Sequence, residues 1–395
     1  MNVLVYADAH LYRTEDGKIW ARTIYGYGFW KRYLNVFENI TVIARMQNAR
    51  KEDVENFCES SGPNVSFVGL PMVRGSQNKF GYIAQFPRAL KIAHRTVRTA
   101  DCGIFRVPAV MGYIVLYLFA KTKRPYALEI VANPFHTYSF GNNIEKNILG
   151  YYLKRAASRA NGVSYVTQYN LQQLFPSYAR LHGESVRHFE SYYSSIDLRK
   201  EYFSVPRDYK KHTGSFKIIH VANQMNDYTK CHKTVIDVTQ SLRKSGYDIQ
   251  TFLIGDGTKR KEFEEYAYSK GLSDAVHFVG ILSSAEKVRE WLLNSDLFLF
   301  PARAEGLPRA LIEAMAVGLP CLSSPEGGIP ELLPEEYLFM PTDTEGIANK
   351  IVQLLSNPLQ LNEMSKSNID KARKYEHSIL QERRDVFLNK LKKLV

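Results

Sequence analysis

The sequence predicts an α/β protein of two doubly wound domains, and three observations support this. The chain has 395 residues, and at roughly 100–200 residues per domain that length suggests two domains. Hydrophobic residues make up 45% and charged residues 23% of the chain, which is ordinary for a globular protein. Short apolar runs also alternate with longer amphipathic segments in both halves, as strands and helices of parallel sheets do.

In the first half, six segments carry this pattern. Five are short and apolar, and we predict that they are buried strands of one parallel sheet. A further segment, residues 90–99, has helical spacing with basic side chains at Lys91, Arg95 and Arg98. The predicted strands are residues 3–6, 40–44, 65–68, 101–105 and 126–131.

A polar stretch separates the two halves. Residues 204–215 contain Pro and Gly and lack apolar periodicity, so we interpret them as a linker. We expect a first domain at residues 1–205, a second domain at residues 206–375, and a C-terminal helix at residues 376–395 that crosses back to the first domain.

The second half repeats the strand and helix alternation more regularly, which predicts a second doubly wound sheet. The predicted strands are residues 216–222, 249–254, 277–279, 297–300 and 320–323. The predicted helices are residues 234–242, 261–269, 285–293 and 311–316. Ligands of such sheets bind outside the carboxyl ends of the strands, so we expect the site there.

Charge is unevenly divided along the chain. The formal net charge is +12, and residues 1–205 hold 26 basic against 15 acidic side chains, whereas residues 206–395 hold 26 against 25. A basic half beside a neutral half predicts that the first domain meets an anionic partner. Candidates are nucleic acid, an anionic membrane leaflet or a phosphate-bearing acceptor, although no helix-turn-helix, zinc or RNP-like pattern supports nucleic acid.

Cysteine spacing and the N-terminus bear on the compartment. Four cysteines lie far apart, without a Cys-x-x-Cys pair, so a zinc site or disulfide framework is not expected. The first residues read as a buried strand rather than a signal peptide. Residues 107–120 are nearly all apolar but are too short to span a bilayer, which takes about 20 residues. This run predicts either a core element or a segment near a membrane surface, and we expect a cytoplasmic protein peripheral to the inner face of the plasma membrane.

The strongest motif lies between residues 298 and 322. A predicted strand ends shortly before Glu305, a turn with Gly306 and Pro308 follows, and Glu313 lies eight positions after Glu305 on the next predicted helix. Free N–H groups at a helix N-terminus favour a diphosphate. Carboxylates beside that end can accept hydrogen bonds from sugar hydroxyls.

This motif, followed by Ala314-Met-Ala-Val-Gly-Leu-Pro320 and by Gly327-Gly-Ile-Pro-Glu331, resembles family 4 of the retaining glycosyltransferases. Residues 216–345 carry the resemblance well, and the rest matches in outline. It implies the architecture called GT-B, in which two Rossmann-like domains face each other across a cleft. It also implies transfer of a hexosyl unit from a UDP- or GDP-linked sugar to a lipid-linked or polysaccharide acceptor, in the style of bacterial cell-envelope polysaccharide biosynthesis.

The resemblance also implies roles for residues of the main motif. Glu305 would bond to the hydroxyls of the donor sugar, and Glu313 would hold the ribose. The backbone N–H groups of Gly306 and Leu307 would meet the diphosphate or the sugar. The alternative is that both glutamates are solvated residues at a helix start.

Lys230 is the second candidate, because it lies between a predicted strand and a predicted helix where the family has a catalytic lysine. By resemblance, it would neutralise the charge that grows on the departing diphosphate. The family's other basic residue is replaced by Asn223. Either Asn223 and Gln224 bind phosphate as neutral donors, or a cation such as Arg303 compensates; Lys233 is a further candidate.

Further candidate residues for binding the nucleotide-sugar have less specific motifs. Gly255 and Gly257 end a predicted strand, and their small size lets either a nucleotide or a neighbouring loop approach. Val279 ends the strand whose family counterpart faces the base. Since there is no Asp-x-Asp motif and the fold generally uses lysine and helix dipoles, we expect no essential metal and no cofactor besides the nucleotide-sugar substrate.

In the first domain, a Gly-rich aromatic segment at residues 24–33 lies where the family has a loop near donor or acceptor. Its Trp30 and Tyr33 either stack on sugars or pack in the core. Asn133 and His136 follow the predicted strand at residues 126–131, close to where family members place a residue that faces the reacting sugar. Other functions for the whole chain are a nucleotide-sugar epimerase of the same fold, a catalytically inactive partner subunit, or a nucleic-acid-binding protein.

Overall fold

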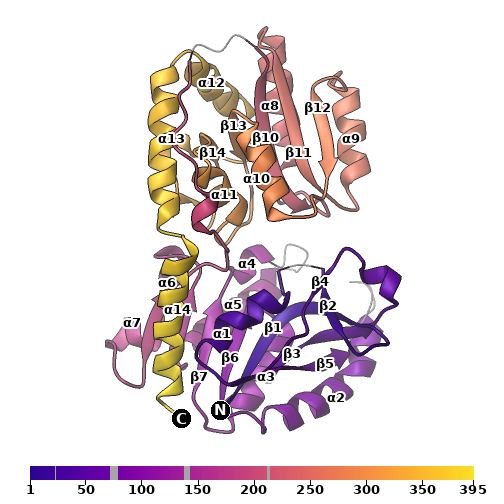
Figure 1. Cartoon of the computed structure of the whole chain (residues 1–395), viewed down its shortest axis with the longest axis vertical. Helices are drawn as coiled ribbons and strands as arrows, with labels where there is room; N and C mark the ends of the chain where they lie inside the picture. Colours follow the sequence, from indigo (N-terminus) through magenta and orange to yellow (C-terminus); the bar gives the residue numbers. More distant parts are fainter. Residues whose placement is uncertain (23, 72–78, 138–142, 211–213) are drawn as a thin grey trace. The chain divides into compact units, whose positions relative to one another are not determined.

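The computed structural model describes residues 1–22, 24–71, 79–137, 143–210 and 214–395. The chain divides into two compact units, of which the first comprises residues 1–193 and 381–395 and the second comprises residues 194–380. Each unit has one central sheet with helices around it (Figure 1). No helix within the described ranges is long and apolar enough to cross a membrane.

The first unit is built on a parallel sheet whose strands run in the order β5-β3-β1-β6-β7-β8-β9. The strands are β1 (Asn2–Arg13), β3 (Asn39–Asn48), β5 (Val65–Pro71), β6 (Cys102–Val107), β7 (Tyr126–Ile130), β8 (Gly162–Tyr165) and β9 (Phe189–Tyr192). The order reverses between β1 and β6. Both of these strands are buried through their centre, which explains why they read as apolar runs rather than alternating ones.

Helices connect the strands of the first unit. They are α1 (Tyr27–Leu34), α2 (Lys79–Thr96), α3 (Val110–Ala120), α4 (Pro134–Thr137), α5 (Asn143–Ala157), α6 (Asn170–Leu174) and α7 (Tyr178–His182), with the short 3₁₀ helix η1 (Lys51–Val54). Two short strands, β2 (Ile19–Ala21) and β4 (Cys58–Glu59), extend the far end of β1 in antiparallel pairing.

Three differences from the sequence prediction stand out here. The strand β1 reaches Arg13, beyond the predicted end at residue 6, because its second half pairs with β2 as well as with β3. The helix α2 begins at Lys79 rather than at residue 90, with Pro87 inside it. The antiparallel strands β2 and β4 were not predicted, because three and two residues are too few to show a period.

The C-terminal helix α14 (His377–Lys392) has its later residues in the first unit. Phe387, Leu388 and Leu391 on this helix are fully buried. The ring of Phe387 packs edge-on against Phe189 and Tyr193, with centroids 5.2 and 5.9 Å apart. Its polar side chains also bond to the first unit, since Gln381 Nε2 donates to the carbonyl of Arg32 at 3.1 Å.

The segment at residues 194–210 packs on the second unit rather than hanging free. Arg207 donates to the carbonyls of Leu292 and Val317 at 2.8 and 3.1 Å, and also to Ser295. Tyr202 donates to Glu286 at 2.7 Å. The polar side chains that suggested a linker therefore hold this segment on the second unit through hydrogen bonds.

The two places where the chain passes between units are tied together. Leu198 and Glu376 form a parallel bridge, and the backbone N–H of His377 donates to Leu198 at 2.7 Å. The ring of His377 also lies 2.5 Å from a carboxylate oxygen of Asp197.

The second unit has a five-stranded parallel sheet in the order β12-β11-β10-β13-β14. The strands are β10 (Phe216–Gln224), β11 (Ile249–Asp256), β12 (Val276–Gly280), β13 (Leu297–Phe300) and β14 (Cys321–Ser323). The order reverses between β10 and β13, which is the point where doubly wound sheets bind their ligands. The predicted strands of this half therefore lie in one sheet, and their carboxyl ends share one edge.

Helices cover both faces of this sheet (Figure 1). They are α8 (His232–Lys244), α9 (Arg260–Ser269), α10 (Ala285–Leu293), α11 (Arg309–Ala316), α12 (Thr344–Leu355) and α13 (Pro358–Arg373), with the 3₁₀ helices η2 (Lys200–Tyr202), η3 (Ile329–Glu331) and η4 (Glu335–Tyr337). The buried residues of α8 recur at helical spacing, and they join Leu253, Phe263 and Leu297 in one core. That packing fixes the loops that follow β10 and β13.

Candidate functional site

The candidate site lies where β10 and β13 end side by side. The two strands pair in parallel, with Ile218 opposite Leu297 and Ile219 opposite Phe298. Because both run in the same direction, the loop after β10 and the loop after β13 leave the same edge of the sheet. The backbone N–H of Arg303 donates to the carbonyl of Thr229 at 2.8 Å, which joins the two loops directly.

Lys230 and Glu305 meet across these loops. The ammonium group of Lys230 bonds to a carboxylate oxygen of Glu305, and it also donates to the carbonyl of Ala304 at 3.0 Å. The two side chains are 25% and 17% exposed, respectively. The pair is therefore shielded but still reachable, and the structure brings together two residues that the sequence identified separately.

Glu313 lies on α11, which begins just after the turn that carries Glu305. Its carboxyl group is partly buried, and burial raises its pKa above the ordinary value, with Arg309 acting in the opposite direction. In the part of the chain that the structure describes, no group hydrogen-bonds to this carboxylate. A shielded carboxylate without a partner is costly, and it can accept hydrogen bonds from a ligand.

The Gly327-Gly328 turn holds the backbone of the Glu305 loop. The N–H of Gly328 donates to the carbonyl of Gly306 at 2.7 Å. Gly327 has a φ of +56°, and a Cβ at this position would lie 2.1 Å from the carbonyl oxygen of Glu305. Only glycine fits so close an approach. The sequence identified these glycines as part of the motif but assigned them no role.

The backbone after Lys230 turns sharply. Cys231 adopts a left-handed conformation with a φ of 53° and precedes the first turn of α8. The resembled family has a glycine after its lysine, which adopts this conformation without strain. Burial raises the pKa of the Cys231 thiol, while the neighbouring Arg303 and Lys230 act to lower it.

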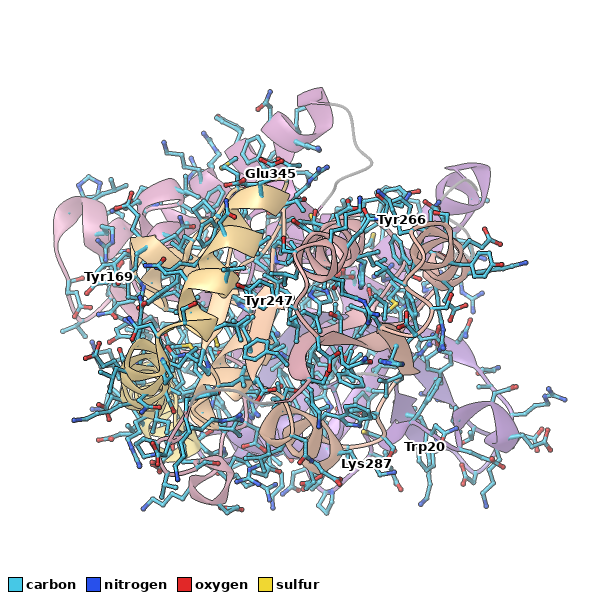
Figure 2. The ribbon with its side chains drawn as sticks, turned by 90° about the horizontal axis from the view of Figure 1, so that it is seen from above. Trp20, Tyr169, Tyr247, Tyr266, Lys287 and Glu345 are labelled. Atoms are coloured by element: carbon cyan, nitrogen blue, oxygen red, sulfur yellow. The ribbon has the colours of Figure 1, made fainter. Side chains whose placement is uncertain are left out.

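Lys233 forms an ion pair with Glu262. Its ammonium group lies 2.8 Å from Glu262, which also bonds to Lys259 at 2.7 Å and accepts from the hydroxyl of Tyr228 at 2.8 Å. These contacts, the one with Lys233 first, lower the pKa of Glu262 to about 2. The same ammonium lies 5.0 Å from the ring of Tyr266, which is labelled in Figure 2. Lys233 thus joins α8 to α9, a geometry that does not favour it as the diphosphate partner.

Asn223 and Gln224 end β10 with exposed side chains, and neither carries charge. Arg303 is exposed on the neighbouring loop, whose backbone bonds to Thr229. The structure therefore places a guanidinium group on the loop beside Lys230, where the sequence analysis suggested that Arg303 could compensate for Asn223.

The glycines after β11 accommodate the loop after β10. Gly255 has a φ of +138°, and a Cβ there would lie 1.9 Å from the carbonyl oxygen of Ala222. A Cβ at Gly257 would lie 2.5 Å from the side chain of Asn226. Of the two interpretations of these glycines, approach of a neighbouring loop is the one that the coordinates describe. Val279 lies partly buried one residue before the end of β12.

Two fully buried histidines, which the sequence analysis missed, lie beneath Lys230. The Nδ1 of His220 donates to the carbonyl of Leu299 at 2.8 Å, and its ring lies 4.8 Å from that of His232. Neither ring nitrogen of His232 has a hydrogen-bond partner among the described residues. Burial lowers the pKa of His220 to about 4 and that of His232 to about 2. Both rings are therefore neutral, and Lys230 is the cation above them.

In the first unit, Asn133 is buried, and its side-chain oxygen accepts a hydrogen bond of 3.1 Å from the N–H of Phe135, the second residue of α4. This contact gives Asn133 a structural role beside any functional one. The side chain of His136 lies outside the described residues. Asn133 belongs to the first unit, whereas Lys230 and Glu305 belong to the second.

The aromatic segment of the first unit packs inward. Trp30 and Tyr33 are buried, so the core alternative holds for both. The hydroxyl of Tyr33 donates to Glu129 at 2.8 Å, Tyr193 donates to the other oxygen of Glu129 at 3.0 Å, and Arg106 forms an ion pair with the same carboxylate. This buried network fixes α1 on the carboxyl end of the sheet. Sequence inspection offered no sign of it, because its members are far apart along the chain.

No cluster of three or more His, Cys, Asp or Glu side chains suited to a metal ion occurs in the described ranges. The charges of Lys230, Glu305 and Glu313 indicate what chemistry these residues can perform. An ammonium group can stabilise negative charge on a leaving group, and the carboxylates can orient hydroxyl groups.

Sequence comparison finds similar proteins among the glycosyltransferases. Residues 206–375 match the family model described as "Glycosyl transferases group 1". The chain is 27% identical over 355 residues to Protein CapJ of Staphylococcus aureus, covering 87% of this chain and 84% of that protein. It is 31% identical over 173 residues to N-acetyl-alpha-D-glucosaminyl L-malate synthase of Bacillus anthracis, covering 42% of this chain and 44% of the relative.

Solved structures share the fold. Sucrose-phosphate synthase from Thermosynechococcus elongatus superposes with a TM-score of 0.72 at 16% identity, covering 100% of both chains. Anabaena HepE, solved in complex with UDP and glucose, gives a TM-score of 0.65 at 16% identity, covering 97% of each chain. The chain therefore has the GT-B fold, and its residues 206–375 are similar to the group 1 glycosyltransferases.

Proposed function

We propose that this chain, whose residues 206–375 are similar to the group 1 glycosyltransferases, transfers a hexosyl unit from a nucleotide-sugar to an acceptor with retention of the anomeric configuration. The observation that carries the proposal is the contact of Lys230 with Glu305 at the adjoining ends of β10 and β13. In this proposal the donor diphosphate binds Lys230, and the donor sugar binds Glu305.

Lys230 would act on the leaving group. Negative charge accumulates on the nucleoside diphosphate as the glycosidic bond breaks, and a fixed cation lowers the free energy of that state. The neighbouring Phe300 ring, whose centroid is 5.7 Å from the ammonium group, and the Ala304 carbonyl hold the lysine in place. Arg303 would add the second positive charge that Asn223 does not supply.

Glu313 would bind the nucleoside. Its unpartnered carboxylate can accept both hydroxyls of a ribose, and the cost of its burial would fall when those hydrogen bonds form. A nucleoside diphosphate without its sugar would therefore still bind through Glu313 and Lys230. The solved Anabaena relative HepE holds UDP and glucose, which supports a uridine nucleotide as the first one to test.

The acceptor that we propose is a lipid-linked or polysaccharide sugar. Relatives with partial coverage include the amylovoran glycosyltransferase AmsK of Erwinia amylovora, 36% identical over 25% of both chains, whose name places it in polysaccharide synthesis. The basic first half of the chain suits an acceptor that carries phosphate. Asn133 and the residue His136 stay proposals for the side of the site that meets the acceptor.

The experiment is a binding and turnover panel on the whole chain. Thermal shift would be measured with UDP-, GDP-, TDP- and CMP-sugars, and the nucleotide that binds would then be used in a donor-hydrolysis assay. We expect Glu313→Ala to weaken nucleotide binding at least about tenfold, the loss of a charge-assisted hydrogen bond of about 1.5–3 kcal/mol. We expect Lys230→Ala to lower turnover more than binding. Parent-like behaviour of both variants would contradict the proposal.

A second function is favoured by one observation, the uncharged and exposed Asn223 at the end of β10. A chain that binds nucleotide-sugar but turns it over too slowly could act as a partner subunit. Donor binding without measurable hydrolysis or transfer would support this function. Conversion of the donor sugar itself without an acceptor would instead indicate an epimerase.

A further inference from the structure

One feature of the first unit has no role in donor binding: the outer surface of α3. Val110 and Tyr117 on this helix are 50% and 60% exposed, and Ile114 between them is partly exposed. These three residues recur at helical spacing, so they form one stripe. Lys121 continues the stripe, with its ammonium group 4.5 Å from the ring of Tyr117. The apolar run at residues 107–120 is therefore buried on one side and exposed on the other.

The helix α5 presents a second stripe of the same kind. Ile148, Tyr151 and Tyr152 are 48%, 61% and 53% exposed. The two tyrosine rings contact each other edge-on, with centroids 6.0 Å apart. Arg155 continues this stripe one turn later, and its guanidinium group lies 3.4 Å from the hydroxyl of Tyr151. Each helix thus combines exposed aromatic side chains with a cation towards its C-terminal end.

Sheet topology places both helices on the same face. The strands β6, β7 and β8 are parallel neighbours, α3 connects the first two, and α5 connects the last two. Connections between parallel strands are right-handed, so consecutive connections that advance in one direction lie on one side of the sheet. The helix α2 packs against α3 and therefore belongs to this layer as well.

Charged residues on this layer are mostly basic. The sequences of α2 and α3 contain no Asp or Glu, and α5 contains a single acidic residue, Glu145. Exposed cations lie at or after the C-terminal ends of α3 and α5: Lys121, Lys123, Lys154, Arg155 and Arg159. The positive excess of the first half of the chain is thus present on the same helices as the exposed tyrosines.

We propose that the layer formed by α3 and α5 docks the protein on an anionic lipid surface. Tyrosine side chains are enriched at membrane interfaces, because the ring is apolar and the hydroxyl is polar. Lysine and arginine beside them bind anionic headgroups, with each cation contributing about fivefold to the partition constant near the surface. The exposed apolar side chains suit the interface of a bilayer, and the cations beside them suit its anionic headgroups. Docking would keep a lipid-linked acceptor near the first unit, but it does not depend on the transferase activity.

Co-sedimentation of the whole chain with vesicles tests the proposal. Vesicles of phosphatidylcholine alone would be compared with vesicles that contain phosphatidylglycerol, at low and at high salt. We expect binding to the anionic vesicles, weakened at high salt because of screening. The triple variant Tyr117→Ser, Tyr151→Ser and Tyr152→Ser should lower binding at least about tenfold. The double variant Lys154→Glu and Arg155→Glu should do the same.

Matched controls come from the second unit. Tyr268 on α9 is 77% exposed, and Tyr268→Ser should leave vesicle binding unchanged. The double variant Lys261→Glu and Lys287→Glu alters charge equally at exposed positions of α9 and α10, and Lys287 is labelled in Figure 2. All variants should keep the circular dichroism spectrum of the parent, because the substituted side chains are exposed. The α3 and α5 variants should also keep the nucleotide affinity of the parent, because the proposed nucleotide-binding residues lie in the second unit.

Several outcomes would overturn the proposal. Equal binding of the parent chain and the α3 and α5 variants would do so, as would equal binding to neutral and anionic vesicles. Retention of RNA on filters without any vesicle binding would assign the basic layer to nucleic acid instead. If the parent chain does not bind nucleotide, the proposed function is contradicted, but the vesicle result still tests the docking proposal. Failure of the proposed function and failure of the docking proposal can therefore be distinguished.

Discussion

At the scale of single residues, the carboxyl groups of Glu305 and Glu313 differ in their surroundings. Glu305 has an ammonium partner, whereas Glu313 has none within the described structure, and burial raises its pKa. A raised carboxyl pKa means that the unfolded chain ionises at lower pH than the folded chain does. The folded state therefore loses stability as the pH rises above 4.5, the ordinary value.

This difference predicts the behaviour of Glu313→Gln. The amide keeps the shape of the side chain but cannot ionise, so we expect the variant to be more stable than the parent at pH 7.5 and equally stable at pH 4. Nucleotide affinity should fall in the same variant, because an amide accepts weaker hydrogen bonds than a carboxylate does. Melting temperatures at several pH values measure the first effect, and titration calorimetry with UDP measures the second. A stability difference that does not change with pH would contradict the prediction.

The buried histidines predict sensitivity to acid. Their pKa values of about 4 and about 2 lie below 6.5, so unfolding takes up protons below pH 6.5, and stability is lost as the pH falls. Because His232 has no partner for either ring nitrogen and stacks on Phe263 at 4.7 Å, His232→Phe should be tolerated. We expect it to reduce the pH slope of the unfolding free energy by up to about 1.4 kcal/mol per pH unit between pH 6.5 and 4.

Urea denaturation of the second unit at a series of pH values checks the histidine prediction. An unchanged slope in His232→Phe would mean that the imidazole is already protonated in the folded chain.

The sequence could identify the candidate reactive residues but not the residues that hold them in place. Lys230 and Glu305 follow strands at recognisable spacing, so their meeting could be expected from the rule that parallel strands end at one edge. The buried histidines could not be found this way, because a histidine in an apolar run looks like any other strand or helix residue. The role of Gly327 depends on a loop from β14 touching the loop from β13, and no local pattern encodes that contact.

At the scale of elements, the turn after β14 determines where Glu305 lies. Gly327→Ala should displace this turn, because the added Cβ would lie 2.1 Å from the Glu305 carbonyl in a left-handed conformation. We expect a loss of donor turnover of at least about tenfold, since a misplacement of about 1 Å can cost a hundredfold. Stability should fall by at least about 1 kcal/mol from backbone strain alone.

Gly271→Ala is a control that distinguishes the effect of backbone strain from the effect of displacing the Glu305 loop. Gly271 also has a left-handed φ, of +72°, but a Cβ there meets no atom within 4 Å. This control should therefore lose stability without losing turnover. Equal turnover in the two alanine variants, measured by donor hydrolysis with folded protein, would show that the Gly327 turn does not position Glu305.

Elements of the second unit were easier to predict than those of the first. Each strand from β10 to β14 is a short apolar run bounded by loops, and each intervening helix has a clear period. In the first unit, β1 changes partners along its length, so its second half pairs with β2 and carries a mixed pattern. Pairing of that kind depends on segments distant in sequence, which a local period cannot show.

At the scale of the whole molecule, the first unit depends on residues from the end of the chain. Phe387 on α14 is buried against Phe189 of β9, and Phe387→Ala should destabilise that unit by about 3–5 kcal/mol. The second unit should keep its stability, because Phe387 belongs to the first unit. Calorimetry would show one transition moving down while another, assigned by its response to UDP, stays in place. A common shift of both transitions would contradict the prediction.

The polypeptide passes between the units twice, once before Ser194 and once before Gln381, and Leu198, Glu376 and His377 tie those passes together. Two covalent connections therefore join the units. A protease that cuts one connection would give two fragments on a denaturing gel, but the other connection would still join the units, so the native molecule would keep its mass. Separation of the units requires both connections to be cut.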